Sequence, residues 1–257
     1  MIEIRAIEEG EASAFLDLLC QIFELDPGRA ATVFYSEPFF DLKRKWALFA
    51  EGQMQSILTT TPLDFGFGRA LGIAGVGTRN GFRGRGYGQR LLEFVLETGE
   101  REGEAAAMLF AHQEVLYTRC GFQLVDEVVK GPLDAHCQLP YAGMLPEGQV
   151  EEIYATWAMG NPMRLRRDAR RWHYWRYVYR ECYAAPGGYV ASETNLCREA
   201  LFNQLPTTWP ILPEAEWYGL RSMTDLLGIP MKTQGVELLV MARGFPATPQ
   251  MFMSDQF

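Results

Sequence analysis

The chain has 257 residues, of which 48% are hydrophobic, and it carries a net charge of −8. This length and apolar content suffice for a full hydrophobic core in one large domain or two modest ones. The acidic balance disfavours nucleic acid as a partner and favours a cationic partner or substrate. No apolar run is long enough to cross a membrane and the N-terminus lacks a signal region, so we expect a cytoplasmic protein with no membrane partner.

The cysteine pattern argues against both a disulfide framework and a metal site. The chain has 5 cysteines, an odd number, with no Cys-x-x-Cys pair and no histidine at metal-ligand spacing. We therefore expect buried free thiols and no bound metal.

Residues 1–140 alternate between the two apolar periods of secondary structure. Alternate apolar residues indicate strands, and apolar residues three and four apart indicate helices. A hairpin is expected where Glu51-Gly52 separates two strand patterns. In chain order, the expected strands are 2–6, 46–50, 54–61, 70–78, 105–111 and 121–129, and the expected helices are 12–23, 30–40 and 88–101.

A glycine-rich loop lies between the buried strand expected at 70–78 and the helix that follows it. Glycines let the backbone approach a ligand and aim successive N–H groups in one direction, and a helix N-terminus adds partial positive charge. The sequence therefore predicts a site for a pyrophosphate. Gln89-Arg90 stands where a P-loop has Lys-Ser or Lys-Thr, and no acidic residue is placed to complete a dinucleotide-binding loop.

Two motifs in this region carry a family resemblance. Arg83-x-x-Gly86-x-Gly88 resembles the Gln/Arg-x-x-Gly-x-Gly/Ala loop of the GNAT superfamily of N-acetyltransferases, which holds the pyrophosphate of coenzyme A. The run Tyr-x-x-x-Gly-Phe that begins at Tyr117 is similar to the element that closes the cofactor site in that family. The resemblance implies the α/β class and a GNAT fold, a mixed central sheet flanked by helices, with acetyl-CoA as cosubstrate and no metal.

The second half, residues 141–257, is expected to follow a breaker-rich linker at 139–146. Its strand, helix, helix, strand pattern resembles the later part of an acetyltransferase domain without the glycine loop. We therefore expect residues 1–140 to form the acetyl-CoA-binding catalytic domain, and residues 141–257 to form a degenerate GNAT-like α/β domain with a C-terminal tail. The expected helices are 150–159, 164–180, 196–205 and 217–227, and the expected strands are 188–192 and 236–242.

Residues 164–180 interleave arginines with aromatic side chains. Such a segment is consistent with gripping RNA or the phosphates of the cofactor. It is equally consistent with a helix that buries Trp172, Trp175 and Val178 and keeps its arginines in water. The overall charge of −8 favours the helix. The segment also loosely resembles an Arg- and Trp-containing stretch in the middle domain of Eis-type acetyltransferases, where it is structural.

Acetyl transfer to an amine needs the thioester held, the amine deprotonated and the leaving thiolate protonated. By the resemblance, Tyr117 matches the general acid, and its phenol, with a pKa of about 10, can donate a proton without being ionised at neutral pH. A packing tyrosine at a helix end is the alternative. Phe257 matches the terminal residue whose carboxylate is the base in Eis-type enzymes, although we expect no counterpart of that family's sterol-carrier-like third domain. A water held by His112 is the alternative base.

The resemblance also implies that segment 30–40 lines the acceptor side; packing of a second helix in the core is the equal alternative. It further implies which residues hold the cofactor. The cofactor-binding residues expected are Val76, Gly77 and Thr78 along the pantetheine arm, Arg83, Gly84, Arg85, Gly86, Tyr87, Gly88 and Gln89 around the pyrophosphate, and His112 and Gln113 beside them.

The sequence therefore predicts an N-acetyltransferase that moves an acetyl group from acetyl-CoA to a primary amine, on a small-molecule or lysine-type acceptor that it does not name. An acyl-CoA-binding or sensing module without transfer is the alternative. Whether the chain forms a homo-oligomer is left open.

Overall fold

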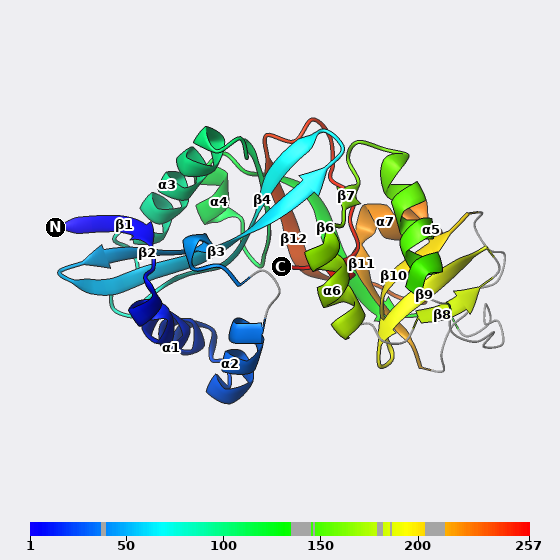
Figure 1. Ribbon diagram of the computed structural model, residues 1–257, viewed down its shortest axis with the longest axis horizontal. Helices are drawn as coiled ribbons and strands as arrows, with labels where there is room; N and C mark the ends of the chain where they lie inside the picture. Colours follow the sequence, from blue (N-terminus) through cyan, green and yellow to red (C-terminus); the bar gives the residue numbers. More distant parts are fainter. Residues whose placement is uncertain (37–39, 135–144, 146, 179–181, 186, 204–213) are drawn as a thin grey trace.

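The computed structural model describes residues 1–36, 40–134, 145, 147–178, 182–185, 187–203 and 214–257. One mixed sheet runs through this part of the chain, in the order β1-β2-β3-β4-β5-β12-β6-β11-β10-β9-β8, with β7 paired to β3 (Figure 1). The strands are β1 Ile2–Ala6, β2 Lys45–Ala50, β3 Gln53–Phe65, β4 Gly68–Thr78, β5 Ala106–Ala111, β6 Gln123–Pro132, β7 Leu165–Arg166, β8 Cys182–Ala185, β9 Gly188–Glu193, β10 Leu196–Phe202, β11 Glu216–Leu220 and β12 Gly235–Arg243. The helices are α1 Ala12–Phe23, α2 Pro27–Ser36, α3 Tyr87–Arg101, α4 Val115–Arg119, α5 Glu147–Met159, α6 Ala169–Val178 and α7 Arg221–Leu226.

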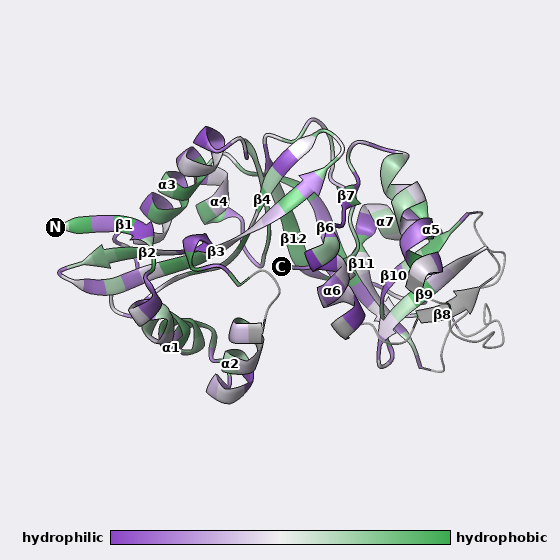
Figure 2. Cartoon of the chain, in the orientation of Figure 1, coloured by the Kyte–Doolittle hydropathy of each residue, from purple (hydrophilic) through white to green (hydrophobic). Residues whose placement is uncertain are grey.

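The strands and helices expected in the first half are confirmed within the described residues, and they form a layered α/β structure. Successive residues of a strand point to opposite faces of a sheet. In β2, Ala47 and Phe49 accordingly join a core cluster with α1 and α2, whereas Leu48 and Ala50 join a cluster with α3. Helices therefore cover both faces of the sheet (Figure 1), and hydrophobic residues run along β2, β3 and α1 (Figure 2).

The second half is joined to the first through the sheet itself. β12 lies between β5 and β6 and is antiparallel to both, and β11 continues the sheet from β6. The division at residue 140 stays a prediction, because the shared sheet crosses it and the expected linker, residue 145 apart, lies outside the described residues.

Two expected helices of the second half are wrong. Segment 196–205 contains the strand β10, and the first part of segment 217–227 is the strand β11, with only α7 helical. The residues of β10 favour helices locally, but its backbone pairs with β9 on one side and β11 on the other. Tertiary pairing has overridden local propensity here.

Segment 164–180 contains a helix, α6, with Trp175 buried; the side chain of Val178 lies outside the described part of the chain. The expectation that its arginines lie in water is wrong for two of them. The side chains of Arg167 and Arg171 are 0% and 6% exposed, because each has carboxylate partners in the interior. Arg170 is exposed as expected.

The cysteines at positions 20, 120 and 197 are buried free thiols, as expected. No helix among the described residues is both long enough and apolar enough to cross a lipid bilayer. The same residues contain no cluster of three or more side chains suited to hold a metal ion.

Candidate active site

The glycine loop joins the end of β4 to the start of α3, and backbone conformation requires glycine at two of its positions. Gly84 has φ +79° and Gly86, which caps the N-terminus of α3, has φ +75°. A Cβ built on either would meet nothing within 4 Å. Space is therefore no constraint, and the left-handed backbone alone selects glycine.

The loop presents a row of backbone donors. The first helical hydrogen bond of α3 runs from the Arg90 N–H to the Gly86 carbonyl, at 3.0 Å. Among the described residues, no backbone N–H from Gly86 to Gln89 donates to a protein acceptor. Such donors at a helix N-terminus suit an anion, and the exposed side chains of Arg83 and Arg85 place positive charge beside them.

The strand before this loop separates from its neighbour. β4 pairs with β5 in parallel only as far as Ile73 and Leu109. Beyond that point β4 continues to Thr78 paired with β3, and β5 continues to Ala111 paired with β12. A register shift in the β3–β4 ladder lies beside this point, where Gly75 has φ +61°, as in a β-bulge that redirects a strand. The edge of β4 that carries Val76, Gly77 and Thr78 therefore faces an opening in the sheet.

The predicted cofactor residues are brought together at this opening. A Cβ on Gly88 would lie 3.4 Å from the Thr78 hydroxyl and 4.0 Å from Leu116 of α4, so the strand end, the helix start and α4 adjoin one another. Tyr87 and Gln89 lie in the first turn of α3. His112 and Gln113 follow β5 directly and are exposed.

Tyr117 lies on α4 and is partly buried against the core under α3. Its ring meets Phe122 edge to face, with the ring centroids 6.2 Å apart. Burial raises the pKa of Tyr117, and the nearby Cys120 adds to this effect. The phenol therefore keeps its proton at neutral pH, whether it acts as an acid or only packs.

Phe257 lies where β4 and β5 begin to separate. Its ring covers Gly72 so closely that a Cβ there would lie 2.8 Å from ring carbons, and its centroid is 5.4 Å from that of Phe110. Gly72 is within the paired part of β4, and Phe110 is the first residue of β5 beyond it. Figure 1 shows the C-terminus at the middle of the molecule, between its two halves.

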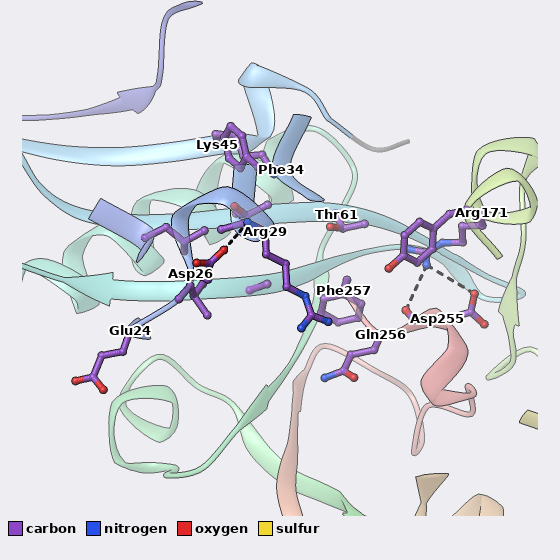
Figure 3. A pocket seen from close by; sticks show the side chains of 17 residues that line it. Glu24, Asp26, Arg29, Phe34, Lys45, Thr61, Arg171, Asp255, Gln256 and Phe257 are labelled. Atoms are coloured by element: carbon purple, nitrogen blue, oxygen red, sulfur yellow. Dashed lines mark hydrogen bonds and ion pairs between the residues drawn. The ribbon is translucent and has the colours of Figure 1, made fainter. Parts of the chain in front are cut away.

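A pocket of about 590 Å³ lies beside Phe257, between the α1–α2 turn, the middle of β3 and β4, and the C-terminal segment (Figure 3). Phe34 meets both expectations for segment 30–40, since its ring lines this pocket and also packs 5.9 Å from that of Phe15. Arg29 points into the pocket toward Phe257 (Figure 3). Residues 37–39 of that segment lie outside the described part of the chain.

The sequence reasoning missed the buried ion pairs of the C-terminal region, which are made by Arg167, Arg171, Glu199 and Asp255. A charged side chain in a strand or tail pattern is normally exposed. No local signal marks these as partners of one another.

Residues 3–125, just under half of the chain, match the family model of the acetyltransferase (GNAT) domain. No curated protein sequence matches the chain significantly. The fold is similar to that of a GCN5-related N-acetyltransferase from Kribbella flavida, with a TM-score of 0.72 and 18% identity over 95% of this chain and 71% of that one. It is similar also to a GCN5-related N-acetyltransferase from Anabaena variabilis, with a TM-score of 0.68 and 16% identity over 95% of this chain and 72% of that one. For Eis1 from Mycobacterium abscessus the TM-score is 0.63 and the identity 15%, over 93% of this chain and 73% of that one. The expected GNAT fold is thus confirmed, and the match to the GNAT domain model falls on the half of the chain that contains the glycine loop.

Proposed function

We propose that the protein is an N-acetyltransferase that moves an acetyl group from acetyl-CoA to a primary amine. One observation carries the proposal: the row of unpaired N–H groups at the start of α3 lies at the end of the same strand edge that faces the opening between β4 and β5. A pyrophosphate on the loop from Gly84 to Gln89 and an extended arm along Val76 to Thr78 would then point one ligand toward Phe257 and the pocket.

The chemistry assigned to the chain follows from this placement. The backbone N–H groups of the loop bind the pyrophosphate, helped by Arg83 and Arg85, while His112 and Gln113 contact the cofactor from the end of β5. Acetyl-CoA supplies the thioester. Tyr117 holds the proton that the departing thiolate takes up, and its raised pKa keeps that proton in place at neutral pH.

Two groups are candidates for the general base. In a chain that ends at Phe257, the α-carboxylate of this residue stands beside the pocket and accepts the proton of the acceptor amine, as in Eis-type enzymes. His112 with a bound water is the alternative. The net charge of −8 favours cationic acceptors such as polyamines, aminoglycosides or lysine side chains.

The test measures binding and turnover separately. Isothermal titration calorimetry with acetyl-CoA and CoA measures cofactor affinity, and release of free CoA thiol is followed with a panel of primary amines. We expect binding of both cofactors and thiol release that depends on an amine. Tight binding without turnover on any amine would instead support an acyl-CoA-binding or sensing module, and absence of binding would refute the assignment of the loop.

A further inference from the structure

A cluster of buried charges lies behind the C-terminal segment and joins three separate parts of the chain. Its members are Arg167, which precedes α6, Glu199 of β10 and Asp255 near the C-terminus, and their side chains are 0%, 0% and 3% exposed. The guanidinium of Arg167 bonds both carboxylates at once: Nη1 lies 3.1 Å from Glu199 Oε1, Nη2 lies 2.8 Å from Asp255 Oδ2, and Nε lies 2.9 Å from Asp255 Oδ1.

Neutral groups complete the hydrogen bonding of the cluster. Glu199 accepts a hydrogen bond from the Trp175 indole N–H at 2.8 Å and further ones from the hydroxyls of Tyr189 and Ser254. The Arg167 guanidinium lies over the ring of Tyr154, 3.8 Å from its centroid. The cluster is thus held from β9, β10, α5 and α6, all in the second half of the chain.

A second arginine connects the same segment to the first half. The side chain of Arg171 donates to the carbonyl of Pro62 in β3 at 3.0 Å and approaches the carbonyl of Asp255 at 3.5 Å. It also lines the pocket beside Phe257, as Figure 3 shows. Next along the chain, Gln256 accepts a bond of 3.4 Å from Arg198.

Packing alone already holds the residues just before this point, since Met251, Phe252 and Met253 are almost fully buried. Burying charges is costly, and a well-packed apolar cluster would bury the segment at least as well. An arginine bonded to two carboxylates fixes the positions of those carboxylates, because its planar guanidinium donates hydrogen bonds only in set directions. The cost of burying these charges is explained if function requires a fixed position for the residues that follow Asp255, and the second of these is Phe257.

We propose that Arg167 is a positioning residue for the acetyl site: by bridging Glu199 and Asp255 it places Phe257 at the opening between β4 and β5, where Phe257 forms one wall of the acceptor pocket. This inference rests on the proposed acetyltransferase function. Arg167 itself touches neither substrate and acts only through Asp255 and the residues after it.

Two conservative variants test the proposal in the full chain. Arg167→Lys keeps the positive charge and loses the fork, and Asp255→Asn keeps the shape and removes one carboxylate. Arg170→Lys, an exposed arginine in α6, is the matched control. Hydrogen exchange measured by mass spectrometry compares peptides of residues 251–257 with peptides of β4 and β5. Steady-state kinetics with acetyl-CoA and an active amine supply the functional readout.

We expect residues 254–257 to exchange at least tenfold faster in both variants, while exchange of residues 251–253, β4 and β5 and the affinity for acetyl-CoA stay unchanged. The kcat should fall at least tenfold and the KM of the amine should rise, while the KM of acetyl-CoA stays the same. Arg170→Lys should match the unmodified chain in every measurement.

Unchanged exchange of the tail, or a uniform rise in exchange over the whole sheet, would overturn the proposal, as would normal kinetics with a released tail. An unmodified chain that shows no turnover on any amine would refute the proposed function instead, and with it the role of Arg167 at an acetyl site. The exchange data would still show whether Arg167 holds the tail, so the two failures are distinguishable.

Discussion

Replacing Gly86 with valine tests the phosphate loop most directly. Gly86 has φ +75° at the N-terminus of α3, and a Cβ there would meet nothing within 4 Å. The fold therefore suffers backbone strain but no clash. A non-glycine residue in the left-handed region costs about 1–2 kcal/mol, which a domain with a typical stability of about 5–15 kcal/mol tolerates.

The effect on the cofactor should exceed this general cost. The introduced valine would relax toward negative φ, which turns the N–H groups between Gly84 and Gln89 away from a common direction, and its branched side chain would stand beside them. We expect the affinity for CoA to fall at least tenfold, about 1.4 kcal/mol. Isothermal titration calorimetry measures this, and thermal unfolding measures the loss of stability.

Gly103→Val is the matched control for this experiment. Gly103 has φ +83° and equally open surroundings, but it lies just beyond the other end of α3. It should therefore lose a similar amount of stability and bind CoA as the unmodified chain does. If Gly86→Val binds CoA normally, or if both variants lose affinity equally, the loop does not hold the pyrophosphate.

Three further predictions concern the reacting end of the site. Tyr117→Phe removes only a hydroxyl, so kcat should fall roughly a hundredfold with cofactor affinity retained. Because burial raises the pKa of Tyr117, kcat should also show no loss from its ionisation below about pH 10; near-normal turnover in the variant would make Tyr117 a packing residue. A tag added after Phe257 converts an α-carboxylate there into an amide, and should lower turnover about a hundredfold without affecting CoA binding, whereas full activity would assign the base to His112. Gly72→Ala places a Cβ 2.8 Å from the Phe257 ring and should cost about 1–3 kcal/mol of stability together with most of the activity; an unchanged melting temperature and kcat would show that the ring is not held there.

Local sequence determined the elements whose apolar period or glycines express their own geometry. The stripe of α3, including Leu91, Leu92 and Val95, is buried as its spacing predicts. The loop before it needs left-handed residues at 84 and 86, and glycine is the residue type that adopts that backbone at no steric cost. These features depend on neighbours in the chain, so a sequence motif can express them.

Tertiary structure decided the features that depend on distant partners. β10 is a strand because β9 and β11 flank it, although its residues favour a helix locally. Arg167 is buried because its guanidinium bonds the carboxylates of Glu199 and Asp255. These partners lie 32 and 88 positions away along the chain, so no local sequence pattern marks them. The position of β12 likewise depends on distant partners, because it pairs with β5 and β6 from the first half of the chain. A buried charge or a pairing partner is selected by the three-dimensional contacts that compensate its desolvation, and these contacts exist only once the chain has folded.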